Sequence, residues 1–193
     1  MKINSLCVYC GARSKVAASY RQAAENLGLA LGSRGITLVY GGGNVGLMGI
    51  CADAALSVGG PVIGVIPEHL KNIEVGHTGL SALYTTPDMH SRKARMFELS
   101  DAFVMLPGGL GTLDEMFEII TWKQIGLHGK PVVVLNTEGY WQPFLDLVDW
   151  TIAKGFATAE TRDLFMTAET VEEVFTLLEN AGETRMDPRT KLF

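Results

Sequence analysis

The sequence lacks the features of membrane-spanning, secreted and nucleic-acid-coating proteins. No apolar run approaches the roughly 20 residues that a membrane-spanning helix needs. The first residues, Met1–Ser5, lead directly into a strand-like run and show no signal-peptide pattern. The formal net charge of −5 has the wrong sign for a nucleic-acid-binding surface. We therefore expect a cytoplasmic protein that binds neither membranes nor nucleic acids.

Cysteine is scarce, and neither cysteine nor histidine occurs with the spacing of a metal site. Cys7 and Cys10 have the C-x-x-C spacing, but a four-ligand zinc site has no second half here, and this pair ends a strand rather than opening a helix as a redox pair would. The chain has four histidines, scattered along its length: His69, His77, His90 and His128. We expect buried or loop thiols, no metal and no cofactor.

The positions of apolar residues predict an α/β protein. With 193 residues and 19% charged residues, the chain fits one globular domain, which we place at residues 1–182 with a loose tail at 183–193. Short apolar runs predict strands at 6–9, 36–40, 61–66, 101–106 and 131–135, and helical patterns lie between them and after the last one, while 67–86 reads as irregular. Repeated strand–helix alternation predicts a doubly wound, Rossmann-like parallel sheet with helices on both faces.

Three glycine-containing loops follow predicted strands, after Tyr9, Tyr40 and Leu106. Because ligands bind at the carboxyl ends of parallel strands, these loops should open on one edge of the sheet. In the third loop, Pro107–Glu115, glycines lead into a helix whose free N–H groups and dipole favour an anion. We expect Thr112 to add a hydroxyl or to cap this helix, and Asp114 and Glu115 to lie in its first turn.

The second glycine loop raises a rival interpretation. Gly41-x-Gly43-x-x-Gly46 satisfies the dinucleotide fingerprint, and Glu68 lies at about the distance of the ribose-binding acid. Against an NAD-dependent dehydrogenase, the loop follows the second strand rather than the first, and the Pro107 loop would have no role. Neither loop contains G-K-[ST], which argues against a P-loop enzyme.

A predicted helix near Pro87 places cations on an apolar face. Met89, Arg92, Lys93 and Met96 share one side of this helix. Surface pairs of Arg92 with Asp88 and of Arg95 with Glu98 would explain the charges without a ligand. We accept that explanation for Arg95, and we favour a ligand role for Arg92 and Lys93 because this helix leads straight into the central strand.

The segment Pro107–Glu115 resembles the PGGxGTxxE signature of the Lonely Guy (LOG) family, whose members are cytokinin riboside 5′-monophosphate phosphoribohydrolases often mislabelled as lysine decarboxylases. The resemblance covers residues 3–180 and includes 10–12, 40–49, 89–93 and 122–126. It implies hydrolysis of the N-glycosidic bond of adenosine 5′-monophosphates, including N6-isopentenyl-AMP, to a free base and ribose 5-phosphate. It also implies a homodimer whose site is completed by the partner chain. Asp114, where many members carry Glu, and Arg13, where a small residue is common, depart from the family pattern.

The resemblance implies that Arg92 and Glu115 are catalytic. The positions implied to bind substrate are Gly42, Gly43, Glu74, Met89, Lys93, Gly108, Gly109, Leu110, Gly111, Thr112, Leu113, Asp114 and Thr121. Because departure of the base leaves positive charge on the ribose, a carboxylate such as Glu115 can stabilise that charge or orient water. Arg92 can either hold the phosphate bidentately or orient Glu115.

Two alternatives to hydrolysis stay open, namely a nucleotide or molybdenum-cofactor carrier of the same fold, and an NAD-dependent dehydrogenase. Lysine decarboxylase activity is disfavoured because no lysine has a recognisable cofactor-linking context.

Overall fold

The computed structural model describes residues 2–71 and 77–182. The predicted substrate-binding residue Glu74 and the predicted tail lie outside the described residues. None of the helices in the described ranges is long and apolar enough to cross a membrane.

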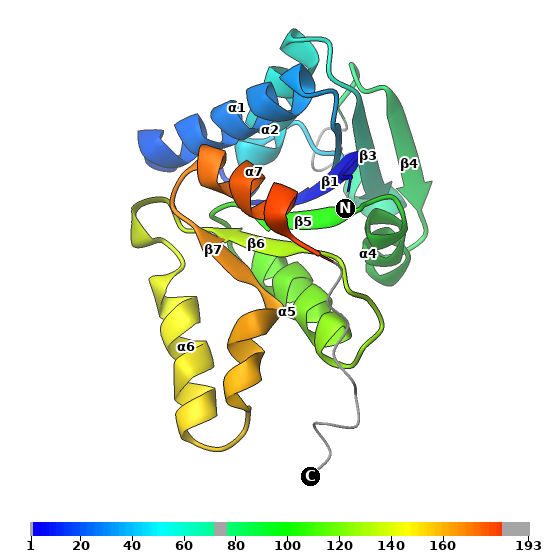
Figure 1. Cartoon of the computed structure of the whole chain (residues 1–193). Coiled ribbons are helices and arrows are strands. Elements are labelled where there is room, and N and C mark those ends of the chain that lie inside the picture. The colour runs from blue at the N-terminus through cyan, green and yellow to red at the C-terminus, as the bar shows by residue number, and fades with distance from the viewer. Residues whose placement is uncertain (1, 72–76, 183–193) are drawn as a thin grey trace.

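The strands form one seven-stranded sheet in the order β4-β3-β2-β1-β5-β6-β7, and every neighbouring pair is parallel (Figure 1). The strands are β1 (Ser5–Tyr9), β2 (Thr37–Tyr40), β3 (Val62–Pro67), β4 (Ala82–Thr86), β5 (Ala102–Met105), β6 (Val132–Leu135) and β7 (Met166–Ala168). The predicted doubly wound parallel sheet is confirmed. Its strand order reverses direction at β1, which lies between β2 and β5, so a crevice is expected at their carboxyl ends.

Helices cover both faces of the sheet, as Figure 1 shows. Their bounds are α1 (Ala18–Ser33), α2 (Gly46–Ser57), α3 (Glu68–Lys71), α4 (Met89–Glu98), α5 (Leu110–Gln124), α6 (Gln142–Ala153) and α7 (Val171–Asn180), with 3-10 turns η1 (Thr137–Gly139) and η2 (Ala159–Leu164). One core cluster lies under α1, α2 and α7, and a second lies under α4, α5 and α6.

The alternation of side chains along β1 separates the two cores. Leu6 and Val8 belong to the first cluster, whereas Cys7 and Tyr9 belong to the second. Cys10 packs against the first cluster, so the C-x-x-C pair is divided between the two sides of the sheet. Within the described residues all three cysteines are free, and no cluster of potential metal ligands is found.

The structure corrects the sequence predictions at the edges of the sheet. The segment predicted to be irregular contains α3 and the edge strand β4, and the other edge strand, β7, was not predicted. Helix α4 begins at Met89 rather than at Pro87, because Asp88 is its N-cap and accepts a 2.8 Å hydrogen bond from the Ser91 N–H. Burial is low along the central residues of β4, and β7 has three residues, so neither carries the apolar pattern of a buried strand.

Candidate active site

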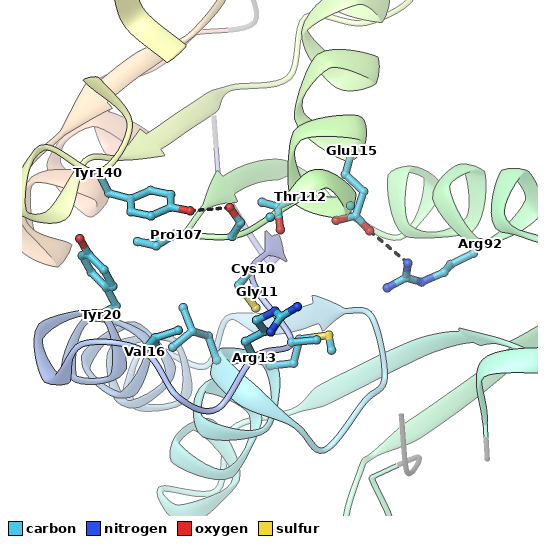
Figure 2. Close-up of a pocket in the computed structure, with 16 residues that line it drawn as sticks. Cys10, Gly11, Arg13, Val16, Tyr20, Arg92, Pro107, Thr112, Glu115 and Tyr140 are labelled. Carbon is cyan, nitrogen blue, oxygen red and sulfur yellow. Dashed lines mark hydrogen bonds and ion pairs between the residues drawn. The ribbon is translucent and has the colours of Figure 1, made fainter. Parts of the chain in front are cut away.

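A cavity of about 410 Å³ lies at the carboxyl ends of the central strands. Its wall is formed by the loops after β1 and β5, the start of α1, α2 and α5, one side chain from α4 and one from the turn after β6 (Figure 2). The lining residues are Cys10, Gly11, Ala12, Arg13, Val16, Tyr20, Leu47, Met48, Arg92, Pro107, Gly108, Gly109, Gly111, Thr112, Glu115 and Tyr140. This volume falls in the usual range for small-molecule sites.

Gly11 ties the three glycine loops together. Its N–H donates to the carbonyl of Pro107 at 3.0 Å, and its own carbonyl accepts a 3.0 Å hydrogen bond from the Leu47 N–H at the start of α2. A Cβ at position 11 would lie 3.2 Å from the Gly108 Cα, so the close approach of these loops favours glycine. The predicted convergence of the loops at one edge of the sheet is confirmed.

The N-terminus of α5 faces this cavity. Gly109 is the N-cap and makes no side-chain capping hydrogen bond, and the first N–H groups of a helix lack partners within it. Thr112 is buried and lies over Gly108, where an added Cβ would come within 2.1 Å of the Thr112 Oγ1. Thr112 is therefore not the helix cap, and its side chain borders the open amides.

The prediction that Asp114 and Glu115 lie in the first turn of α5 is wrong. The helix begins at Leu110, and its first turn contains no acidic residue. This register puts the Glu115 side chain one turn beyond the open amides, on the cavity side, whereas the Asp114 side chain points outward and is 59% exposed. Glu115 lines the cavity and Asp114 does not.

Arg92 and Glu115 form a buried ion pair across the cavity. The Arg92 Nη1 lies 3.2 Å from the Glu115 Oε1, and each side chain is only 8% exposed (Figure 2). The Arg92 Nε donates a 3.1 Å hydrogen bond to the carbonyl of Val65, which fixes the direction of the guanidinium. The alternative pair of Arg92 with Asp88 is wrong, whereas the surface pair of Arg95 with Glu98 is confirmed at 3.0 Å.

Gly41 makes room for this arginine. A Cβ at position 41 would lie 2.1 Å from the Arg92 Nη2, so a side chain there would collide with the guanidinium. The glycine after β2 thus serves the Arg92–Glu115 pair, a role that was missed in the sequence analysis because the contact joins residues distant in the chain.

The rest of the second glycine loop is used for packing. A Cβ on Gly46 would lie 2.4 Å from the Ala12 carbonyl carbon, and Gly46 has a φ of 59°, which also favours glycine. The Leu47 N–H is already bonded to Gly11. The backbone of Ala12 and the Arg92 side chain lie directly against this loop. The loop geometry therefore argues against binding of a dinucleotide pyrophosphate there.

Lys93 links α4 to α5. Its Nζ lies 3.0 Å from a carboxylate oxygen of Asp114 and 3.0 Å from one of Glu118. Burial by itself lowers the pKa of Lys93, but the hydrogen bonds and charges of Asp114 and Glu118 outweigh it and hold the pKa above its usual value. Lys93 does not line the cavity, so its role in substrate binding stays a prediction.

The structure brings together some of the residues that were predicted to bind substrate. Those that line the cavity with Arg92 and Glu115 are Gly108, Gly109, Gly111 and Thr112. Those outside its lining are Gly42, Gly43, Met89, Lys93, Leu110, Leu113, Asp114 and Thr121. Met89 still contacts the site, since its sulfur lies 3.9 Å from the Arg92 Nη1, whereas Leu110 and Thr121 are exposed on the outer face of α5.

Several lining residues were missed as site residues in the sequence analysis. Val16, Tyr20 and Tyr140 belong to no motif, Met48 lies in a stretch of the family resemblance but was not named as a site residue, and Arg13 was noted only as a departure from the family pattern. Arg13 is exposed and lies across the cavity from Thr112 (Figure 2). The cation at Arg13, two residues after Cys10-Gly11, was the signal in the sequence that pointed to this wall.

Cys10 also lines the cavity, but its thiol is not activated as a nucleophile. Burial raises the pKa of the Cys10 thiol well above its usual range, so the group stays protonated. A protonated thiol is a poor nucleophile, so Cys10 is not a candidate for nucleophilic attack.

The chain is similar in sequence to a known protein family and to several curated enzymes. A family profile described as "Possible lysine decarboxylase" matches residues 48–178. A cytokinin riboside 5′-monophosphate phosphoribohydrolase of Rhodococcoides fascians is 47% identical over 87% of this chain and 85% of that protein. Enzymes of the same name from Arabidopsis thaliana and Oryza sativa are each 44% identical, over 93% and 92% of this chain and 84% and 74% of theirs.

Solved structures with this fold include proteins of another kind. A molybdenum cofactor binding protein of Rippkaea orientalis superposes with a TM-score of 0.70 at 22% identity, covering 93% of this chain and 97% of that one. A molybdenum cofactor carrier protein of Chlamydomonas reinhardtii gives 0.69 at 21% identity, covering 92% and 96%. At such identities the likeness establishes the fold alone. The identity to the phosphoribohydrolases is twice as high and spans nearly the whole chain, so this chain belongs to the Lonely Guy (LOG) family.

Proposed function

We propose that this protein hydrolyses the N-glycosidic bond of adenosine 5′-monophosphates, including N6-substituted ones, to the free base and ribose 5-phosphate. The observation that carries the proposal is a single cavity in which the open N-terminus of α5 lies one helical turn from the buried Glu115–Arg92 pair. An anion site and a carboxylate at that separation match the 5′-phosphate and the ribose of a nucleotide. The names of the 44–47% identical relatives support the same substrate class.

The phosphate is held by amides and by the exposed cation Arg13 at the cavity wall. The amides of Gly109–Thr112 donate to its oxygens, and the helix dipole favours its charge. Arg13 faces these amides from the opposite wall and supplies a guanidinium, which binds phosphate in a bidentate manner. Arg92 is bonded to Glu115 and Val65, so its part is to orient the carboxylate rather than to hold the phosphate.

Glu115 acts at the sugar. As the bond from C1′ to the base nitrogen breaks, its electron pair leaves with the base and positive charge develops on the ribose. The Glu115 carboxylate stabilises this charge and orients the water whose oxygen bonds to C1′. One proton of that water is finally taken up by the departing base, which balances the reaction as a hydrolysis.

The direct test is to incubate the protein with AMP and with N6-isopentenyl-AMP and to follow the free base by chromatography. We expect release of base and of ribose 5-phosphate in equal amounts. Adenosine should react poorly because it leaves the phosphate site empty. Unreacted nucleotide at high enzyme concentration would reject the proposal, and tight AMP binding without base release would favour a carrier of the same fold.

We further propose that the protein is a homodimer with the site near the interface. The outer face of α5 carries exposed apolar residues, Leu110 and Phe117, which are 86% and 41% exposed, and Ile125 follows at 47%. Asp114 and Thr121, which the family resemblance implicates in substrate binding, lie on this outward face. Packing α5 against a second copy covers the apolar residues and presents those two side chains to the partner's cavity.

Light scattering with size-exclusion chromatography tests the dimer, and Phe117→Asp should shift the mass to that of a monomer. Complementation tests the shared site. If Thr121 serves the partner's cavity, chains with Glu115→Gln and chains with Thr121→Ala should regain activity when mixed, because one of the two sites then has both residues. No gain on mixing, with subunit exchange verified, would place Thr121 outside the partner's site.

A further inference from the structure

Tyr140 makes a short contact with the loop that begins α5. Its hydroxyl donates a 2.6 Å hydrogen bond to the carbonyl of Gly108, and both residues line the cavity (Figure 2). Tyr140 lies far along the chain from the Pro107–Glu115 segment and belongs to none of the motifs that indicated the site. The contact therefore comes from the tertiary fold alone.

The turn that carries Tyr140 is held in place on both sides. The side chain of Asn136, which is buried, accepts a 2.7 Å hydrogen bond from the Trp141 N–H and donates to Glu169 at 3.1 Å. Glu138 has a φ of 54°, in the left-handed region that non-glycine residues rarely adopt. Its carboxylate accepts a 2.9 Å hydrogen bond from the Ser19 hydroxyl of α1. A strained backbone conformation persists only where the surrounding structure holds it, so these contacts fix the shape of the turn.

The ring of Tyr140 is also braced by α1. Tyr20 packs edge-on against it, with 5.2 Å between ring centroids and an interplanar angle of 74°. Such edge-to-face pairs are a favoured arrangement of aromatic rings. Tyr140 thus approaches the Gly108 carbonyl from a fixed position, with its hydroxyl as the only hydrogen-bonding group of the side chain.

The hydrogen bond sets the orientation of one peptide group. The Gly108 carbonyl and the Gly109 N–H belong to the same planar peptide, and the described residues contain no cis peptide bond. In a trans peptide the N–H points opposite to the carbonyl, so the Gly109 N–H points away from Tyr140. Two glycines in sequence leave this peptide free to rotate unless something outside the loop holds it.

We propose that Tyr140 is a positioning residue for the 5′-phosphate: by holding the Gly108 carbonyl, it aims the Gly109 N–H at the anion and keeps the loop ready for binding. This inference rests on the proposed function, because it assigns the amides of α5 to a phosphate. Donation to the carbonyl also polarises the peptide and strengthens its N–H as a donor. The effect acts on binding of the anion rather than on the step at C1′.

The test is Tyr140→Phe, which removes the hydroxyl and keeps the ring against Tyr20. Binding is measured by calorimetry with AMP, ribose 5-phosphate and adenosine, in chains that also carry Glu115→Gln so that no substrate is consumed. We expect AMP and ribose 5-phosphate to bind roughly tenfold more weakly and adenosine to bind as before. In chains with Glu115 intact, KM for AMP should rise by a similar factor while kcat changes less than about twofold.

Tyr84→Phe is the matched control, because Tyr84 lies on the edge strand β4, outside the cavity lining, and should leave every constant unchanged. Tyr20→Ala is a second test variant, which removes the ring that packs against Tyr140. It should also weaken anion binding, although Gly108 and its hydrogen-bond donor are unchanged. Unchanged anion binding in Tyr140→Phe, or an equal loss for adenosine, would overturn the inference. Failure of the proposed function has a different signature, namely anions bound by the unaltered chain but no base released.

Discussion

The Arg92 Nη1 and the Glu115 Oε1 lie 3.2 Å apart on two different helices, with both side chains almost withdrawn from solvent. Helices α4 and α5 precede and follow β5 in the chain, so the pair joins the two helices beside the carboxyl end of β5. Isolated buried charges are costly, and this geometry is therefore stable only while both partners are present.

Glu115→Gln should retain the fold and lose activity. The amide has almost the same shape as the carboxylate but lacks its negative charge, so it cannot stabilise positive charge on the ribose. We expect kcat to fall by roughly 10²–10⁴-fold, the usual range for a positioned acid–base or electrostatic group. Steady-state kinetics with AMP measure this, and Glu98→Gln, at a surface ion pair, is the control. A loss below tenfold would remove Glu115 from the reacting centre.

Arg92→Met should destabilise the protein more than Arg92→Met combined with Glu115→Gln. The single change takes the arginine away from a buried carboxylate, at a cost of about 3–5 kcal/mol, whereas the double change also removes the charge of that carboxylate. Urea unfolding of the two variants and of Glu115→Gln completes a double-mutant cycle. Additive free energies of unfolding would show that the pair is not coupled.

Gly41→Ala should reduce activity although no catalytic group is replaced. The new methyl would stand 2.1 Å from the Arg92 Nη2, so the guanidinium must move away from Glu115. Displacement of a positioning group by about 1 Å can cost up to roughly 10²-fold in rate. Gly182→Ala is the control, since a Cβ there meets nothing within 4 Å. Equal kcat values for the two variants would contradict the proposed role of Gly41.

Arg13→Gln should weaken phosphate binding. A charge-assisted hydrogen bond contributes about 1.5–3 kcal/mol, which predicts an increase in KM for AMP of roughly 10- to 150-fold. The low rate with adenosine should not change, because adenosine has no phosphate for Arg13 to bind. Arg21→Gln, on α1 and outside this cavity, serves as the control. A KM unchanged within twofold would assign the phosphate to the amides alone.

Stability should decline at alkaline pH because the Cys51 thiol ionises more readily in the unfolded chain than in the folded protein. Burial raises the pKa of Cys51 from 9.0 to about 12. Because the folded pKa exceeds the unfolded one, the stabilisation is complete below pH 9 and is lost as the pH rises towards 12. Cys51→Ala should flatten the fall in unfolding free energy between pH 9 and 12 by up to about 1.4 kcal/mol per pH unit. Parallel curves for the two proteins would contradict this assignment.

The central strands of the sheet and part of the cavity lining can be predicted from the sequence. β1, β2, β5 and β6 are short buried runs, so composition and length reveal them. The edge strands β4 and β7 are exposed or very short and leave no apolar pattern. The loop at Pro107–Thr112 and Glu115 belong to one short segment, so their common place at the cavity was predictable. Gly41 and Tyr140 contact distant segments, and Arg13 reaches the cavity only through the fold, which no spacing in one sequence expresses.

Neither α2 nor α5 has a side-chain cap, but at the start of α2 the Gly11 carbonyl takes up the Leu47 N–H, whereas the start of α5 faces the cavity. The two glycine loops are therefore unequal starting points for protein engineering. Adding an acid near Glu68 would not convert the chain into a dinucleotide-binding protein, because the strand exit at residues 11–13 would first have to be rebuilt. New anionic ligands are better sought at α5, where redesign leaves the packing of the other loop intact.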